Sequence, residues 1–212
     1  QAFYSSISAM FITVIFHFIG KTSYAYLLNE ILVIVMNICF SYMLLAITLP
    51  LLEYFLNIPT VFRLHELCLA DTPVLSRLRS QAVGTFNHVN NVSDMAYHAA
   101  KEIGVNSELA RVGGLYHDIG KGDHPEYFIE NQKDKNVHDD MKVTLSAAVI
   151  KSHVKSGVEK GKEMGLPQEV IDIIDQHHGN DLIQYFYNLA VKEAENSAVP
   201  YTVNEEDFRY NS

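Results

Sequence analysis

The chain has little cysteine, little basic charge and, over its first 62 residues, almost no charge of either sign. Its two cysteines, Cys39 and Cys68, are too few for a disulfide framework and lack the spacing of a metal–thiolate site. Residues 63–212 carry 15 Lys and Arg against 23 Asp and Glu, a net charge of −8 with His neutral. Because long nucleic acids are bound mainly through Lys and Arg at phosphates, we expect no long nucleic acid partner. A phosphate-bearing substrate would have to meet bound cations instead.

The scarcity of charge in the first 62 residues points to a membrane, since the charged side chains there are only Lys21, Glu30 and Glu53. The uncharged segments 2–20 and 31–52 have 19 and 22 residues. About 20 apolar helical residues cross the hydrocarbon core of a bilayer. We therefore expect transmembrane helices in contact with lipid within residues 1–58. A buried core helix is the alternative, stronger for 2–20 because that segment holds three serines and His17.

A basic region before the first apolar segment is also missing, which argues against a secretory signal peptide. The chain begins with Gln1, and we expect it to be the later part of a larger membrane protein. Residues 59–80 are expected to form the linker that leaves the membrane. Three arginines in this linker favour a cytoplasmic exit under the positive-inside rule. The following domain, 81–212, is then cytoplasmic.

Alternating polar and apolar runs, which would indicate strands, are absent after the linker, so we expect an all-α domain. Apolar residues recur instead with the 3.6-residue period of a helix. Capping residues and glycines mark where these periodic segments begin and end. Four helices are predicted in this way, at residues 85–103, 107–119, 143–164 and 167–178.

Histidines recur through the predicted helices together with one carboxylate, at His88, His117, Asp118, His153, His177 and His178. Neutral imidazoles and a carboxylate suit first-row metals such as Fe, Mn or Zn. In an adjacent His-Asp pair the Asp118 carboxylate can bridge two cations, which activate a water and clamp a phosphate. A lone histidine is more often a hydrogen-bonded core or surface residue. The joint occurrence of all six in one helical domain is what favours a metal site.

Several sequence strings add a family resemblance: TPVLSRLRSQAVGTFNHV, ARVGGLYHDIGK, FIENQ, LPQEVIDIIDQHHG and EEDFRY. They resemble the seven-transmembrane HD family, the PgpH-type cyclic di-AMP phosphodiesterases of the HD hydrolase superfamily, over roughly residues 49–210. The resemblance implies a multi-pass protein of the bacterial inner (cell) membrane. It also implies a helical-bundle HD phosphohydrolase domain that cleaves a cyclic dinucleotide, cyclic di-AMP, to linear pApA. Two divalent first-row metal ions, most often Fe or Mn, and a homodimer are compatible with it.

Carried over to this sequence, the resemblance makes all six His and Asp residues metal ligands, with Asp118 bridging. Asp118 and Lys121 become the expected catalytic residues, and Lys121 would neutralise charge on the phosphate. The alternative for Lys121 is a solvated lysine at a helix C-terminus, which the helix dipole favours. Asn131 and Gln132 of the FIENQ string are implied, with Lys121, to bind the substrate.

The sequence departs from the family pattern in three places. Asn87 stands where relatives usually have a second His, and Val83 replaces a Pro; neither removes a ligand. The family's last ligand is an Asp farther along than Ser212, so this chain is expected to lack one ligand of the first metal. Asp207 belongs to a different string and does not fill that place.

Two other functions stay open on the sequence. One is a membrane sensor whose non-catalytic HD domain binds a nucleotide or a partner without turnover. The other is an HD phosphohydrolase acting on a different nucleotide, such as a dNTP or an alarmone. All ligands that fall within this chain are intact, which argues against the first. The seven-transmembrane context and the FIENQ and EEDFRY strings argue against the second only through the resemblance.

Overall fold

The computed structural model describes residues 11–12, 14–15, 17, 19–20, 23–56, 59–69, 72–133, 135–199 and 201–211. The chain divides into two compact units, Gln1–Asn57 and Ile58–Ser212, here called unit 1 and unit 2. The described residues contain helices and no β-strand, and the one isolated bridge joins Leu182 to Arg209. The predicted all-α class is confirmed.

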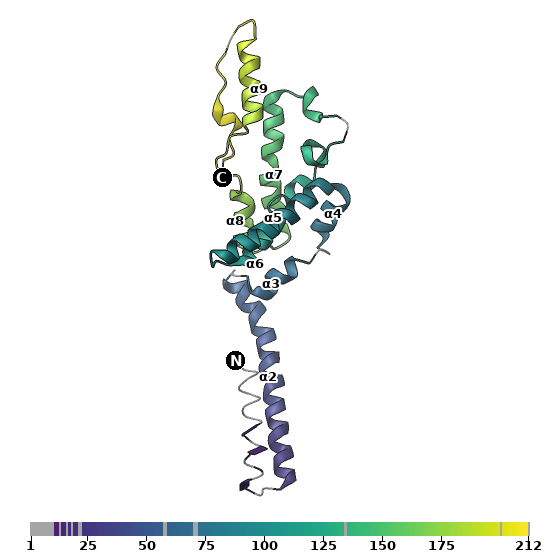
Figure 1. Ribbon diagram of the computed structural model, residues 1–212, viewed down its shortest axis with the longest axis vertical. Coiled ribbons are helices and arrows are strands. Elements are labelled where there is room, and N and C mark those ends of the chain that lie inside the picture. The colour runs from purple at the N-terminus through teal and green to yellow at the C-terminus, as the bar shows by residue number, and fades with distance from the viewer. Residues whose placement is uncertain are drawn as a thin grey trace. The chain divides into compact units, whose positions relative to one another are not determined.

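Unit 1 is dominated by α2, the continuous helix Tyr24–Leu56 of 33 residues (Figure 1). Its stretch Tyr24–Glu53 is long and apolar enough to cross a membrane, and its apolar side chains are largely uncovered in the structure. The predicted span 31–52 falls inside this helix. The other predicted span, 2–20, lies for the most part outside the described residues. The structure therefore supports one candidate span in the part of the chain that it describes.

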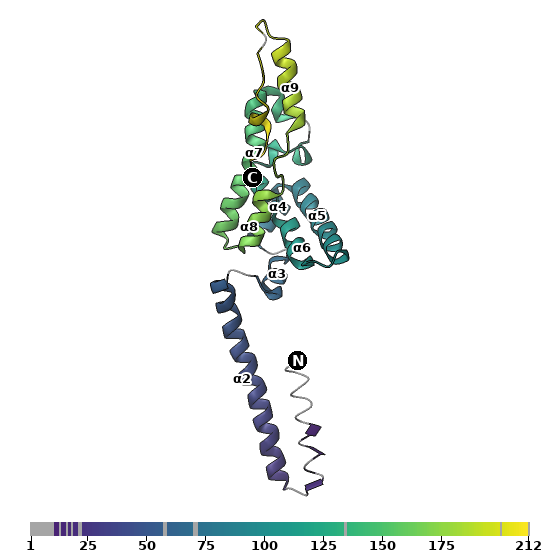
Figure 2. The same ribbon diagram turned by 90° about the vertical axis from the view of Figure 1, so that its left-hand side faces the viewer.

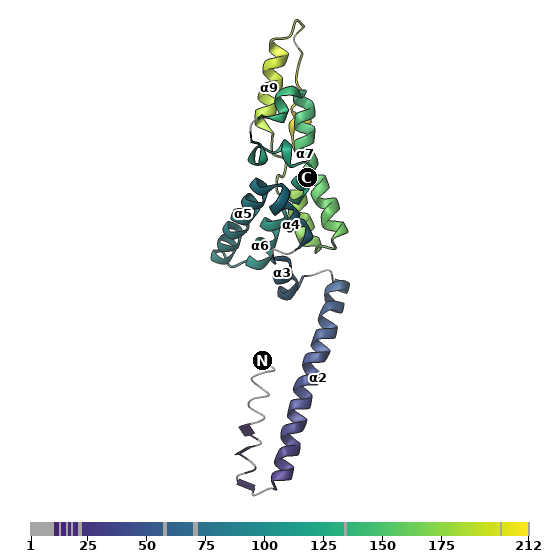
Figure 3. The ribbon, with the colours of Figure 1, turned by 90° about the vertical axis from the view of Figure 1, so that its right-hand side faces the viewer.

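Unit 2 is a helical bundle, and its α-helices are α3 (Val61–Leu67), α4 (Pro73–Gln81), α5 (Val83–Glu102), α6 (Ser107–Tyr116), α7 (Val143–Glu163), α8 (Gln168–Gln176) and α9 (Gln184–Glu195). Figures 2 and 3 show α5 and α6 together on one side of the unit, α7 on the other, and α9 beside one end of α7. Short 3₁₀ turns connect α6 to α7: η1 (Ile119–Gly122), η2 (Pro125–Tyr127), η3 (Ile129–Asn131) and η4 (Val137–Asp140). A last turn, η5 (Glu205–Phe208), follows α9.

The four predicted helices correspond to α5, α6, α7 and α8, with one informative difference. The second was expected to reach residue 119, but α6 ends at Tyr116. Asp118 leaves the helical backbone, with φ −107° and ψ 16°, before η1 begins. The interruption turns His117 and Asp118 toward the interior instead of continuing a helix.

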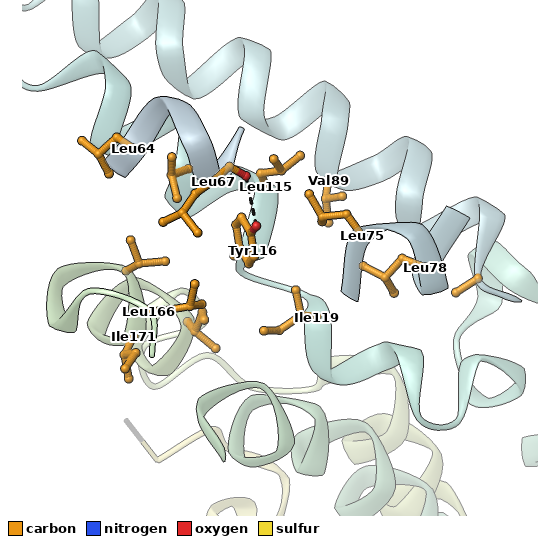
Figure 4. Close-up of a cluster of buried hydrophobic side chains, with 14 residues drawn as sticks. Leu64, Leu67, Leu75, Leu78, Val89, Leu115, Tyr116, Ile119, Leu166 and Ile171 are labelled. Atoms are coloured by element: carbon orange, nitrogen blue, oxygen red, sulfur yellow. Dashed lines mark hydrogen bonds between the residues drawn. The ribbon is translucent and has the colours of Figure 1, made fainter. Parts of the chain in front are cut away.

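The segment 59–80, expected only as a linker, forms α3 and α4 and supplies part of the core. Four of its leucines, Leu64, Leu67, Leu75 and Leu78, are almost completely buried. Figure 4 shows them around Tyr116 and Ile119, the residues that flank His117 and Asp118 in the sequence. The Tyr116 hydroxyl donates a 3.0 Å hydrogen bond to the carbonyl of Leu67. The helices that follow unit 1 are thus packed directly against the segment that carries Asp118.

A second, smaller core lies between α7, α9 and η5. It is built from Val143 and Ala147 of α7, Phe186 and Ala190 of α9, and Phe208 of η5. This core fixes the C-terminal segment against α7, so that Tyr210 comes near the histidines after α8.

Candidate metal centre

The six predicted ligands come from four places in unit 2 and converge on one carboxylate. His88 lies in the first half of α5, His117 and Asp118 follow α6, and His153 lies within α7. His177 and His178 follow α8. Residues 90 positions apart in the sequence are thereby brought within the reach of one side chain.

One oxygen of Asp118 faces the first group of histidines. Asp118 Oδ2 lies 3.2 Å from His117 Nε2 and 3.6 Å from His88 Nε2. The ligand atoms of His88, His117 and Asp118 all lie within 4.8 Å of one another. We call these three residues the first triad.

The other oxygen of Asp118 faces the second group. Asp118 Oδ1 lies 3.3 Å from His153 Nε2 and 3.7 Å from His177 Nε2. The ligand atoms of His153, His177 and His178 also lie within 4.8 Å of one another. We call these three the second triad, and Asp118 therefore lies between two sets of ligand atoms.

Backbone carbonyls hold three of the imidazoles by the nitrogen that points away from the centre. The Nδ1 atoms of His117, His153 and His177 lie 2.8, 2.5 and 2.8 Å from the carbonyl oxygens of Gly114, Ile150 and Ile174. Since a carbonyl only accepts, each Nδ1 carries the proton, and each neutral ring presents its Nε2 lone pair to the centre. This tautomer is the one in which histidines bind metals.

The resulting arrangement brings imidazole nitrogens close to both carboxylate oxygens, an arrangement that bound cations would stabilise. Asp118 is 2 % exposed, and its Oδ1 has no hydrogen-bond partner among the residues that the structure describes. Two ligands bonded at about 2.1 Å to one metal, 90–109° apart, lie about 3.0–3.4 Å from each other. The separations of 3.2–3.7 Å between Asp118 and the imidazole nitrogens are close to that range. The residues present therefore fit divalent metal ions.

Burial and neighbouring charges set the protonation of the centre. Burial alone would raise the pKa of Asp118, but contacts with His117 and His153 and the Lys121 charge hold it well below its usual range. Burial lowers the pKa of His177 and of His178 to about 4. At neutral pH the carboxylate is ionised and both imidazoles are neutral, the forms that bind metals.

Lys121 is enclosed within the centre. Its Nζ lies 2.9 Å from Asp118 Oδ2 and 3.0 Å from Glu130 Oε1, and its side chain is 14 % exposed. Burial opposes its charge, but Asp118 and Glu130 outweigh that effect and raise the pKa of Lys121. The alternative of a solvated helix-end lysine is therefore wrong. The ammonium group is close enough to the triads to reach a phosphate bound there.

Asn131 holds two segments of the protein together. Its Oδ1 accepts from the Thr85 N–H at 3.1 Å, and its Nδ2 donates to Thr85 Oγ1 at 2.9 Å. This pair ties η3 to the start of α5, three residues before His88. Gly84 permits the approach, because a Cβ there would lie 1.9 Å from the Glu130 carbonyl oxygen. Asn131 is thus placed to position the site, and its predicted contact with substrate stays a prediction.

Gln132, the other predicted substrate-binding residue of the FIENQ string, uses only one end of its amide within the protein. Its Nε2 donates to the carbonyl of Glu126 at 2.9 Å. Its Oε1 is buried and has no partner among the described residues. The predicted contact of Gln132 with substrate stays a prediction.

Three further residues shape the centre without having been expected to do so. Glu130 accepts from Lys121 and from the hydroxyl of Thr85, at 3.0 and 3.1 Å. Tyr210 stacks on His178, with ring centroids 4.0 Å apart and planes 12° from parallel. Gly120 lets η1 lie against α7, because a Cβ there would lie 1.9 Å from the carbonyl oxygen of His153. The strings that contain these residues were recognised, but no spacing rule pointed to their roles.

Comparison with known proteins gives the family. The HD domain model matches residues 85–204, a segment that contains all six ligands. The chain belongs to the HD domain family. Its His and Asp residues form two groups whose ligand atoms lie close enough together to hold divalent metal ions.

The relatives of this HD domain are bacterial. The chain is 45 % identical over 163 residues to an uncharacterised protein of Synechocystis sp., which covers 76 % of this chain and 20 % of the relative. It is 43 % identical over 163 residues to the cyclic-di-AMP phosphodiesterase PgpH of Listeria monocytogenes, which covers 76 % and 22 %. The chain thus spans about a fifth of the length of these curated relatives.

A solved structure resembles the HD domain as well. The crystal structure of the L. monocytogenes PgpH HD domain in complex with cyclic-di-AMP matches with a TM-score of 0.61 at 42 % identity. The match covers 68 % of this chain and 64 % of that one.

Proposed function

We propose that this HD domain is a metal-dependent phosphodiesterase that hydrolyses cyclic di-AMP to linear pApA. One observation carries the proposal: the solved HD domain that this chain matches at 42 % identity holds cyclic-di-AMP. The two triads around Asp118 support it, because they bring six of the metal ligands expected for such a centre together in this chain.

We propose two divalent first-row ions, Fe or Mn, as cofactors. His88, His117 and Asp118 would hold one ion, and the second triad with Asp118 would hold the other. Nitrogen donors combined with a carboxylate suit Fe and Mn, and no thiolate lies in either triad. When bound, such a pair activates a water as nucleophile and neutralises charge on the phosphate and the leaving oxygen.

The protein's own residues hold, orient and charge this centre. Asp118 presents Oδ2 to the first triad and Oδ1 to the second, and would hold an ion on each side. The carbonyl-bound imidazoles keep their Nε2 atoms aimed inward. Lys121 presents a buried positive charge beside Asp118, where it stabilises negative charge that develops on the phosphate.

The net charge of the domain limits the kinds of substrate that it can bind. With a net charge of −8 over residues 63–212, unit 2 has no general field to attract a long RNA or DNA. A small dinucleotide needs only the local positive charge of the centre. Both triads are intact, which favours catalysis over a non-catalytic sensor.

We also propose that the chain is part of a multi-pass membrane protein with unit 2 in the cytoplasm. The apolar helix α2 and the arginines that follow it support this. Protease added to intact bacterial protoplasts should leave unit 2 whole, and protease added after permeabilisation should digest it. Digestion in intact protoplasts would place unit 2 outside the cell.

A hydrolysis assay tests the proposed function. The chain, loaded with Mn or Fe, is offered cyclic di-AMP, a dNTP, an alarmone and a single-stranded RNA, and products are separated by chromatography. We expect pApA from cyclic di-AMP as the dominant reaction, abolished by a chelator and restored by metal. Faster cleavage of another nucleotide would show that this nucleotide, and not cyclic di-AMP, is the substrate. Binding of cyclic di-AMP without turnover under any metal would favour the non-catalytic membrane sensor.

A further inference from the structure

Glu130 lies in η3, nine positions after Lys121 in the sequence, and its carboxylate contacts the ammonium group of that lysine. Lys121 Nζ lies 3.0 Å from Glu130 Oε1 and 2.9 Å from Asp118 Oδ2, so it is held between two carboxylates. It also lies 5.0 Å from the centre of the Phe128 ring, which is within the range of a cation–π contact. Lys121 is therefore held in place from three sides.

A chain of hydrogen bonds fixes the carboxylate of Glu130 in turn. Asn131 Nδ2 donates to Thr85 Oγ1 at 2.9 Å, and the Thr85 hydroxyl donates its own proton to Glu130 Oε1 at 3.1 Å. Glu130 Oε1 thus accepts from both Thr85 and Lys121. Thr85 is completely buried near the start of α5, three residues before His88. The helix that supplies a ligand of the first triad therefore also holds the partner of Lys121.

Lys121 and an ion at the first triad would carry charges of the same sign beside the same oxygen. Asp118 Oδ2, which Lys121 contacts, is also the oxygen that faces His88 and His117. The ammonium group would repel a divalent ion bound there, because charges a few ångströms apart in a buried site are weakly screened. A second carboxylate on Lys121 offsets this repulsion and gives the ammonium group a partner other than Asp118. Glu130 supplies that carboxylate.

We propose that Glu130 is a positioning residue that shares the Lys121 ammonium group with Asp118 and offsets its charge, so that the first triad can bind an ion beside a lysine. The inference rests on the ion proposed for the first triad and adds what regulates its affinity. Because Glu130 would act through Lys121, its charge should matter only while the lysine is present. A residue that only held the fold together would matter equally with or without the lysine.

A titration of the metal-free full chain with Mn²⁺, in detergent, tests this role without any substrate. Calorimetry should resolve two binding steps, and the step that His88→Ala abolishes belongs to the first triad. Glu130→Gln keeps the size of the side chain and an acceptor for Thr85 but removes the charge. We expect it to weaken Mn²⁺ binding in the first-triad step about 5- to 100-fold. Glu126→Gln is the matched control, because the exposed Glu126 side chain lies on the same loop and pairs with His124, and it should leave that step unchanged.

A double-mutant cycle with Lys121 shows whether Glu130 acts through the lysine. In a Lys121→Met background, Glu130→Gln should change the affinity of the first-triad step by less than about 3-fold, because no ammonium group remains to be offset. Equal losses in the two backgrounds, or no loss from Glu130→Gln alone, overturn the inference. The second-triad step is the internal control and should stay unchanged in every variant. A loss in both steps would be a general structural effect and would overturn the inference as well.

Hydrolysis of cyclic di-AMP by the Mn-loaded chain separates this inference from the proposed function. If the chain produces pApA but the two substitutions act additively on Mn²⁺ binding, the role of Glu130 is wrong and the function stands. If the substitutions are coupled but no dinucleotide is cleaved with any metal, the role of Glu130 stands and the function is wrong. If no binding step depends on His88, both the ion at the first triad and the role of Glu130 are wrong.

Discussion

The two triads, each of which faces one oxygen of Asp118, differ in how exposed their side chains are. In the second triad the His153 side chain is 1 % exposed, and both His153 and His177 are fixed by backbone carbonyls. In the first triad the His88 side chain is 47 % exposed, and Lys121 competes for the same Asp118 oxygen. Closed ligand sets hold structural metals, while catalytic sites keep an open position. The difference suggests that the second triad holds its ion firmly and that the first triad is the side at which the reaction takes place.

That contrast has a consequence for metal affinity. With three imidazoles and Asp118 Oδ1 near one point, the second triad should bind its ion more tightly than the first triad binds its own. The open first triad is then the side where a water and the scissile phosphate have access.

The largest effect is expected from Asp118→Ala, which removes the residue common to both sides. We expect cyclic di-AMP hydrolysis to fall by at least about 1,000-fold, because both ions lose a ligand and nothing separates their charges. Metal content should fall as well, measured by elemental analysis of the dialysed protein. Asp123→Ala is the matched control, since Asp123 binds Lys160 and Ser156 and lies outside the triads. An Asp118→Ala chain with two metals and normal turnover would remove Asp118 from the mechanism.

Replacing one histidine on each side should separate the two roles. His153→Ala should remove the tight ion and lower the melting temperature by roughly 3–8 °C, because it empties a buried position. His88→Ala should leave the melting temperature nearly unchanged and remove only the weakly held ion, together with most of the activity. Metal analysis during stepwise chelation and thermal unfolding measure both. Loss of the same ion from both variants would contradict the claim that the two triads bind separate ions with different affinities.

Lys121→Ala should have a smaller, purely kinetic effect. The variant should keep its metals and turn over cyclic di-AMP about 10- to 1,000-fold more slowly, the usual cost of one charge-stabilising donor. Lys160→Ala is the control, because Lys160 is similarly shielded but binds Asp123 instead of Asp118. Unchanged turnover in Lys121→Ala would make this lysine a structural partner of Asp118 and Glu130 only.

The smallest effect concerns the pH dependence of stability in the metal-free chain. The pKa of His177 and of His178 is about 4 in the folded state, below the unfolded value of about 6.5. Their contribution is therefore complete above pH 6.5 and is lost as the pH falls toward 4, where the unfolded chain binds more protons. Melting temperatures between pH 7.5 and 4.5 should show this decline, and His178→Gln should flatten it. A decline of equal steepness in His178→Gln would assign it to other groups.

The sequence predicted the long helices well because they leave a periodic signal. It also singled out six residues that the structure brings together, and their role as metal ligands stays a prediction. The helices α5 and α7 carry a clear 3.6-residue rhythm, and the six His and Asp residues stand out in an otherwise ordinary domain. The short helices α3 and α4 were missed because seven and nine residues leave little periodicity and their four leucines are visible as core only in three dimensions.

Other features depend on contacts that sequence spacing does not encode. The early end of α6 follows from the packing of η1 against α7 at Gly120. The pairing of Asn131 with Thr85 joins residues 46 positions apart, and Lys121 is buried by Glu130 of the following loop. A cavity of about 450 Å³ likewise forms only where the η2–η3 segment, η4, α7 and α9 meet.

Anomalous X-ray diffraction from crystals of the Mn-loaded chain would locate each bound ion relative to Asp118. We expect two ions about 3.5–4 Å apart. One should contact Asp118 Oδ2 and the first triad, and the other Asp118 Oδ1 and the second triad, with the more complete occupancy on the second. A single ion, or two ions that do not share Asp118, would contradict a two-metal centre built around this carboxylate.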